Sequence, residues 1–288
     1  MKRTTFSLWF LLTSGTLATL SASPPVIGMA LSPGAFSINN ASVPGSATVL
    51  DGSTIQTAAA FSDIRLTNSV RLTLGDRASA TLYRQRAVLH SGTVELRSAP
   101  GYQIEAQALR VGASGPGARI DVGVQDGERV TVASLSGKAE VRTGSGTLIA
   151  RLMPGEAREF DPAPPSLVRL SGILTRLGAV YVLDDEVTHV RVQLRGNALG
   201  DMLEKRVRVS GIAGSGTPQA GASQLVDVTD IQPVETAKVG GLGGSGPKPA
   251  AVAFGVSVRT IAIAGGIAGA GAIGGLAAAG AFSGSVSR

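Results

Sequence analysis

The chain of 288 residues is long enough for two small domains and flanking segments. Glycine (39 residues) and proline (14) are frequent, whereas aromatic residues make up 4% and charged residues 16%, so the composition favours an all-β protein with many turns over a large enzyme with an aromatic core. The absence of cysteine excludes disulfides, thiol catalysis and Cys-ligated metal centres, and the net charge of +6 is spread over single arginines, which argues against nucleic-acid binding.

Residues 1–30 are expected to be an export signal. Lys2 and Arg3 precede an apolar run that ends near Leu20 and is too short for a comfortable membrane span. Small residues near Ser23 would suit cleavage, although a proline follows at once, and a site after Ala30 is the alternative. An uncleaved N-terminal anchor is the other interpretation of this segment.

Residues 31–160 predict a multi-stranded β domain. Apolar and polar residues alternate in short runs, most clearly from 49 to 141, and glycine-containing turns interrupt them every eight to twelve residues. Turns are expected at Asp51-Gly52, Ser91-Gly92 and 115–117, with a separate strand on either side of each. About a dozen short strands without a helix predict a sandwich, a jelly roll or a β-helix-like stack.

Five segments of this domain resemble the FecR-type periplasmic domain: DGSTIQT at 51–57, RLTLGD at 71–76, LHSGTVEL at 89–96, VTVASLSGKAEV at 130–141 and LMPGE at 152–156. In that family glycines sit at turns and strands stack between them, and the named members relay the state of an outer-membrane transporter to a sigma-factor system. Those regulators carry a cytoplasmic segment and a transmembrane helix before the domain, where this chain has a signal-like segment. The resemblance therefore implies the β module and does not carry sigma-factor signalling with it.

The proline-rich stretch 161–166 predicts a connector between domains. Beyond it, residues 167–233 contain five strand candidates and one short helix candidate at 197–204, with Asn197 as a plausible N-cap. This order resembles a small five-stranded OB-like barrel. OB folds often bind oligonucleotides or sugars, but Tyr181 is the only aromatic residue here, so the stacking platform for nucleic acid is missing.

Two segments follow the second domain. Residues 234–260 are expected to be a linker rich in glycine, lysine and proline. Residues 261–282, from Ile261 to Phe282, form an uncharged Gly/Ala-rich stretch long enough to span a bilayer and spaced for close helix contact. Few of its residues are strongly apolar, so two interpretations of this stretch stay open: a weakly membrane-associating helix and a flexible tail.

No residue is assigned a catalytic, cofactor-binding or metal-binding role. His90 and His189 fall in different domains, and the acidic run Asp184-Asp185-Glu186, the one candidate for calcium, is more typical of a solvated hairpin. Asp121 and the acids at 126 and 128 have the same interpretation. The glycines at 112–117 lack the Lys-Ser/Thr pair and the helix of a phosphate-binding loop.

The sequence thus predicts a non-enzymatic, exported cell-envelope protein that binds or scaffolds another envelope component through its FecR-like domain. The expected partner is an envelope protein or a glycan, not nucleic acid. Two alternatives stay open: a cell-surface signalling component that senses a partner protein, and a polysaccharide-associated binding module.

Overall fold

The computed structural model describes residues 24–97, 101–125, 129–162, 167–234, 250–253 and 256–261. Most of the expected export signal, the acids at 126 and 128, most of the connector at 161–166 and the stretch 262–282 lie outside the described residues.

The protein is mainly β, as the sequence predicted. Twelve strands build the N-terminal domain: β1 (Val26–Ile38), β2 (Ala41–Leu50), β3 (Ser53–Thr57), β4 (Ser62–Leu66), β5 (Arg71–Leu74), β6 (Ser79–Leu82), β7 (Arg86–Arg97), β8 (Gln103–Ala106), β9 (Leu109–Gln125), β10 (Arg129–Thr143), β11 (Leu148–Leu152) and β12 (Glu156–Pro162). The second domain contains β13 (Leu167–Leu177), β14 (Val180–Asp185), β15 (Arg191–Arg195), the 3₁₀ turn η1 (Gly200–Met202), β16 (Arg206–Ala213) and β17 (Gln224–Pro233). A further hairpin, β18 (Ala250–Ala253) and β19 (Val256–Ile261), follows.

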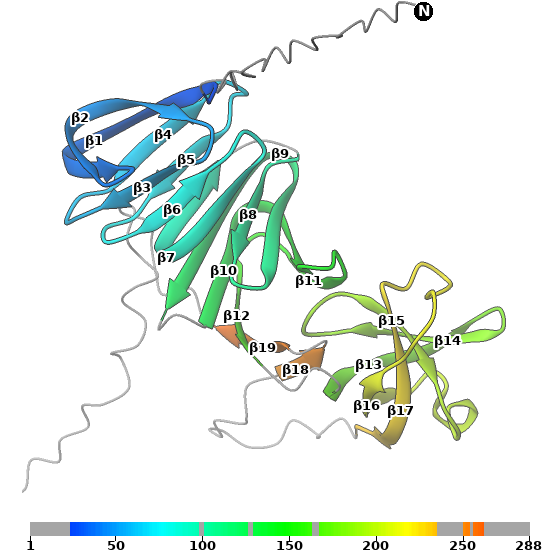
Figure 1. Ribbon diagram of the computed structural model, residues 1–288. Coiled ribbons are helices and arrows are strands. Elements are labelled where there is room, and N and C mark those ends of the chain that lie inside the picture. The colour runs from blue at the N-terminus through cyan, green and yellow to red at the C-terminus, as the bar shows by residue number, and fades with distance from the viewer. Residues whose placement is uncertain are drawn as a thin grey trace, which may run out of the picture.

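Long strands divide the N-terminal domain into two sheets that share a core (Figure 1). The first half of β1 pairs with β4, and its second half pairs with β3. Strand β7 likewise pairs with β6 before its middle and with β5 after it, so that β1, β4, β5, β7, β6 and β3 close into a ring. Strands β9 and β10 pair with each other along almost their whole length, and both strands take part in both sheets.

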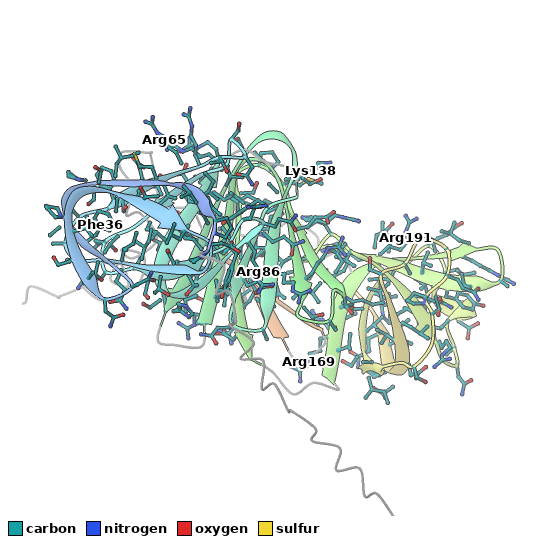
Figure 2. The ribbon with its side chains drawn as sticks, turned by 45° about the horizontal axis from the view of Figure 1, so that its top comes forward. Phe36, Arg65, Arg86, Lys138, Arg169 and Arg191 are labelled. Carbon is teal, nitrogen blue, oxygen red and sulfur yellow. The ribbon has the colours of Figure 1, made fainter. Side chains whose placement is uncertain are left out.

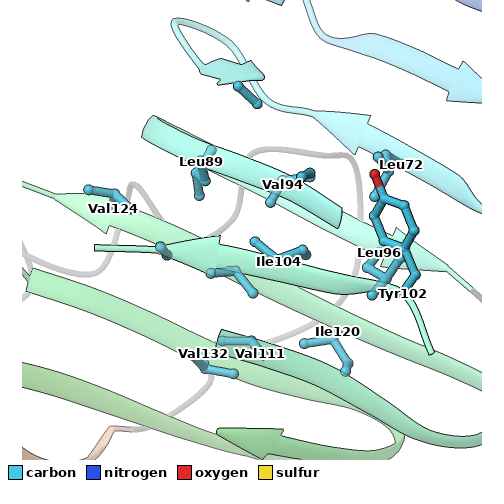
Figure 3. Close-up of a cluster of buried hydrophobic side chains, with 14 of the residues drawn as sticks. Leu72, Leu89, Val94, Leu96, Tyr102, Ile104, Val111, Ile120, Val124 and Val132 are labelled. Atoms are coloured by element: carbon cyan, nitrogen blue, oxygen red, sulfur yellow. The ribbon is translucent and has the colours of Figure 1, made fainter. Parts of the chain in front are cut away.

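The first sheet is the half of the N-terminal domain that contains β4, β5 and the C-terminal part of β7. It continues through residues 119–124 of β9 and the start of β10 to β12. The half that contains β3, β6 and β8 is the second sheet, and it ends at β11. Apolar side chains from both sheets form one buried cluster between them, including Leu72, Leu96, Ile104 and Ile120 (Figure 3). The alternating polar side chains face outward.

Glycine permits the long strands to pass from one sheet to the other. Gly92 in β7 and Gly137 in β10 have φ angles of 79° and 72°. A Cβ atom on Gly92 would lie 2.5 Å from Cα of Ala78, and one on Gly137 would lie 2.7 Å from Cβ of Ala118. Both positions therefore require a residue that tolerates positive φ and carries no side chain.

This geometry corrects the turns that the sequence predicted. Ser91-Gly92 is a bend inside the continuous strand β7 and does not separate two strands. Residues 115–117 likewise lie inside β9, which runs without interruption from Leu109 to Gln125. In both strands, the residues before the bend pair in one sheet and the residues after it pair in the other. The sequence pattern that was expected to mark a turn therefore marks a change of sheet.

Two of the predicted domain boundaries also need correction. The first domain begins at Val26 and not at residue 31, because β1 pairs with β2 and β4 from there and buries Ile27 and Ala30. The segment 234–260, expected to be a linker, contains β18 and most of β19.

The second domain is the five-stranded barrel that was expected. Strand β13 pairs with β14 and β16, β14 with β15, β15 in parallel with β17, and β17 with β16, which closes the ring. Its own core includes Leu174, Val192 and Val209. The predicted helix at 197–204 is only the single turn η1, and its N-cap is Leu199 without a side-chain bond, so Asn197 does not cap it.

The C-terminal hairpin joins the two domains. Strand β19 pairs antiparallel with β12 from Ala157 to Pro162, and β18 contacts β13 through the pair of Arg169 and Val252. Figure 1 shows this hairpin, in orange, between the N-terminal domain and the barrel. The first sheet therefore continues through the hairpin toward the second domain.

Candidate functional site

The acids of the run 184–186 bind different partners within the protein. Asp184 makes a two-point ion pair with Arg191 at 2.8 Å for both contacts, and Glu186 pairs with Arg206 at 2.6 Å. Asp185 turns inward instead. In the part of the chain that the structure describes, no group of three or more His, Cys, Asp or Glu residues is placed to hold a metal ion.

Asp185 organises the loop between β14 and β15. Its carboxylate accepts hydrogen bonds from the Ser171 backbone N–H at 2.8 Å and from both the N–H and the hydroxyl of Thr188 at 2.7 Å. Burial raises the pKa of Asp185, against the effect of these donors. This carboxylate therefore has a structural role.

The two histidines contact different residues in different parts of the protein. Nε2 of His90 is 2.9 Å from the hydroxyl of Thr81 on the outer side of the second sheet. Nε2 of His189 is 3.1 Å from Oε1 of Glu156, at the junction between the domains. The structure does not bring the histidines together.

The His189 contact belongs to a polar junction. The buried guanidinium of Arg158 donates to the carbonyl of Val187 at 3.0 Å and to Glu156 Oε1 at 3.3 Å. Two further bonds cross the junction, from Arg151 N–H to the carbonyl of Thr188 and from Gln224 Nε2 to the carbonyl of Leu148, both at 2.7 Å. These bonds hold the barrel against β11 and β12.

The best candidate for a binding site is a hollow of about 110 Å³ on the outer face of the second sheet. Strands β8, β9 and β10 build it in register, with Gln103 opposite Gly112 and Gly112 opposite Glu140. Gly112 leaves the space open, because a Cβ there would meet no atom closer than 3.9 Å. The lining residues are Gly101, Tyr102, Gln103, Arg110, Gly112, Ala113, Glu140 and Arg142.

Two arginines on neighbouring strands flank this hollow. Arg110 and Arg142 are directly opposite each other in the β9–β10 pairing. Nη2 of Arg142 donates to Glu140 at 2.8 Å, and Nε of Arg110 lies 3.3 Å from Glu105. The two guanidinium groups are thus held by different carboxylates.

The charge state of the hollow follows from these contacts. Burial opposes ionisation of Glu140, but hydrogen bonds from Arg142 and Arg151 outweigh it and lower the pKa of this carboxyl group. The phenol of Tyr102 donates to the carbonyl of Tyr83 at 3.2 Å, and burial raises its pKa. At neutral pH the hollow therefore presents fixed guanidinium donors, one carboxylate and the amide of Gln103.

This arrangement suits recognition of one small polar group. Ligand pockets for whole small molecules enclose roughly 300–1,000 Å³, whereas this hollow has about 110 Å³. Donors and an acceptor on three adjacent strands can bond a carboxylate or a pair of hydroxyl groups that project from a larger partner.

This site was not among the sequence-based predictions. Gly112 was considered only as part of a possible phosphate-binding loop, and the arginines only for their contribution to the net charge. A usable signal was the pattern Glu140-x-Arg142, repeated in Glu95-x-Arg97, because residues two apart share one face of a strand.

Comparisons with known proteins give little further guidance. No family model and no curated protein matches the chain. Two crystal structures of a "putative anti-sigma factor" from Parabacteroides distasonis ATCC 8503 are similar at a TM-score of 0.32 each, with 17% and 16% identity over 38% of this chain. The aligned part covers 54% of those chains, about half of their length.

Among the described residues, no helix is long and apolar enough to span a bilayer.

Proposed function

We propose that this protein is an exported, non-enzymatic binding protein of the cell envelope. Its FecR-like domain binds a projecting polar group of another envelope component in the hollow around Gly112. The observation that carries this proposal is the pair of opposed arginines, Arg110 and Arg142, beside a gap left open by glycine.

The energetics favour binding at this position. The arginines are already fixed by Glu105 and Glu140, so little side-chain entropy is lost when a ligand arrives. The floor is a β-sheet whose inner face packs on the core, so the donors keep their spacing. The hydrogen bond from Arg158 to the carbonyl of Val187 holds the barrel beside the domain.

Filling the hollow tests the proposal. The Gly112→Gln side chain would occupy the space without a backbone clash. A Gly144→Gln variant, in the turn after β10, is the matched control, since a Cβ at this exposed glycine comes no closer than 3.6 Å to another atom. The immobilised full-length chain and both variants are exposed to solubilised envelope components.

The expected result is one component that the wild-type chain and Gly144→Gln retain and that Gly112→Gln loses. Equal retention by Gly112→Gln, with an unchanged circular dichroism spectrum, would show that the hollow is not the binding site. Retention of no component at all would remove the binding proposal.

A signalling role is the second candidate, and the C-terminal hairpin favours it. Because β19 pairs with β12 and β18 contacts β13, a change in the first sheet can reach the barrel through backbone hydrogen bonds. Hydrogen exchange of residues 250–261, measured with and without the retained component, tests this. Unchanged protection would argue for binding without transmission.

A further inference from the structure

A row of four arginines crosses the outer face of the first sheet, away from the hollow. Arg65 on β4 is directly opposite Arg71 on β5, Arg71 is opposite Arg97 on β7, and Arg97 is opposite Arg119 on β9. Their sequence neighbours on β4, β5, β7 and β9, such as Ile64 and Leu72, are buried, so the four side chains project outward. Figure 2 shows Arg65 on the outer surface of the domain.

The spacing of this arginine row is set by the sheet. Neighbouring strands lie about 4.8 Å apart, so the four stems follow one another at about that interval over roughly 14 Å. Met29 on β1 is opposite Arg65 and Ser136 on β10 is opposite Arg119, which ends the row on both sides. The face therefore carries a short line of cations that runs across the strands.

Half of the row shares a single carboxylate. Oε1 of Glu95 lies 2.6 Å from Nε of Arg97 and 3.0 Å from Nε of Arg119. These contacts lower the pKa of Glu95, although burial opposes this. Arg65 and Arg71 have no carboxylate within ion-pair distance among the described residues, and both are exposed.

Like charges placed directly opposite each other destabilise a sheet. The opposed pair Arg65 and Arg71 thus costs folding energy that an external anion would recover. Guanidinium groups bind carboxylates through two parallel hydrogen bonds, which favours such an anion over a diffuse counterion.

A second polar row runs beside the first and narrows the choice of anion. Asp63, Thr73, Glu95 and Asp121 are opposite one another on the same four strands, two residues along from the arginines. The hydroxyl of Thr73 donates to Asp63 at 2.8 Å. The carboxylates of Asp63 and Glu95 in this row accept hydrogen bonds and repel closely spaced phosphates, but they suit a partner that carries hydroxyl groups next to its charges.

We propose that the arginine row binds a linear acidic polysaccharide whose sugar carboxylates contact the arginines and whose hydroxyl groups face the acidic row. Neither row contains an aromatic residue, so the stacking on which single-stranded nucleic acids depend is missing from this surface. This site is independent of the hollow around Gly112, which lies on the opposite sheet.

Binding of polygalacturonate to the full-length chain tests this proposal. Wild-type protein is titrated at low salt in the presence of EDTA, with neutral dextran as the ligand control. We expect binding to polygalacturonate only, with an affinity that falls steadily as sodium chloride is raised. Equal binding to dextran would overturn the proposal.

Charge reversal within the row gives the decisive comparison. Arg71→Glu and Arg65→Glu should each weaken polygalacturonate binding at least about tenfold. Arg208→Glu on β16 is the matched control, because Arg208 is also an exposed strand arginine that makes no ion pair within the described part of the chain. It should change the affinity less than about twofold. Equal losses in all three variants would mean that net charge alone attracts the ligand, which rejects the row as a site.

Two further binding measurements distinguish the polysaccharide site on the arginine row from a nucleic-acid site and from binding in the hollow. A single-stranded oligonucleotide that binds more tightly than polygalacturonate would assign the row to nucleic acid and reject the polysaccharide. Gly112→Gln should bind polygalacturonate like wild type, so failure of the hollow and failure of the arginine row are distinguishable. A loss in Gly112→Gln would place the polysaccharide in the hollow and overturn the proposal.

Discussion

Single buried charged side chains in this protein are held by several hydrogen-bond partners each. Arg158 at the junction reaches two carbonyls and the carboxylate of Glu156, and Asp185 in the barrel accepts three hydrogen bonds. Removing one partner of such a group leaves buried donors or acceptors unpaired, and this costs more than the loss of an exposed ion pair.

The neighbouring residues Asp184 and Asp185 allow a direct test. Asp185→Ala leaves the N–H groups of Ser171 and Thr188 without their acceptor and should lower the free energy of unfolding of the barrel by about 3 kcal/mol. Asp184→Ala removes an exposed pair with Arg191 and should cost less than about 1 kcal/mol. Urea denaturation of the full-length chain measures both, and equal effects would contradict the structural role of Asp185.

The raised pKa of Asp121 predicts that the stability of the protein depends on pH. Burial, with a smaller contribution from the charge of Glu95, raises its pKa from 3.8 to about 7. Between pH 4 and pH 7 the folded state then holds a proton that the unfolded state has released, so this residue's stabilising contribution is lost as the pH rises toward 7.

Asp121→Asn removes this titration. The variant should be more stable than wild type at pH 8, by up to about 4 kcal/mol. The difference should shrink toward pH 4, where the folded wild-type chain is also uncharged at this position. Thermal unfolding across this pH range provides the measurement, with the acidic end as the internal control. A constant difference at all pH values would refute the assignment.

At the scale of elements, the bent strands define the N-terminal domain. Gly92 faces Ala78 and Gly137 faces Ala118, so the same close contact of glycine and alanine occurs at two of the bends. Each bend lets one strand serve both sheets, and the core between the sheets is covered without long connecting loops.

A comparison of two glycines separates backbone strain from close packing. Gly137 and Gly155 both have positive φ, 72° and 82°, but only at Gly137 would a Cβ meet another residue. Gly155→Ala should cost about 1–2 kcal/mol, and Gly137→Ala should cost a further 1–3 kcal/mol, approximately, from the contact with Ala118. Chemical denaturation of both variants measures the difference, and similar costs would show that the bend can adjust.

These bends also explain which parts of the fold the sequence could predict. The alternation of apolar and polar residues identified the strands, and tight turns such as Asp51-Gly52 are present. A serine followed by glycine does not distinguish a turn from a bend within a strand, because both need a residue with positive φ. Whether the chain reverses or changes sheet depends on the pairing partners, and these lie far away in the sequence.

The candidate site was harder to predict than the fold for a related reason. Arg110 and Arg142 are opposite each other only because β9 and β10 pair over their whole length. The same applies to the arginine row, whose members come from four strands. The sequence contains the residues, but the register that aligns them is a property of the folded sheet.

At the scale of the whole molecule, the C-terminal hairpin connects two domains that each have a core of their own. Without it, β12 would present an open edge, and exposed strand edges promote pairing with other chains. The hairpin therefore stabilises the junction and covers the edge of the first sheet.

Truncation tests this role. A chain that ends at residue 249 lacks β18 and β19, whereas a chain that ends at residue 261 keeps them and is the matched control. The shorter chain should keep both domains folded, lose amide protection in β12 and sample a wider range of domain orientations. Hydrogen exchange and small-angle scattering measure these effects, and identical behaviour of the two chains would contradict the proposed role.

The pairing of β12 with β19 also affects the order of folding. The paired residues are separated by on the order of 100 residues of chain, and contacts between distant segments form slowly. During synthesis from the N-terminus, β12 is complete long before its partner exists, so the growing chain carries an unpaired edge. A nascent chain of this protein should thus need a chaperone, or rapid barrel folding beside β12, until β19 is synthesised.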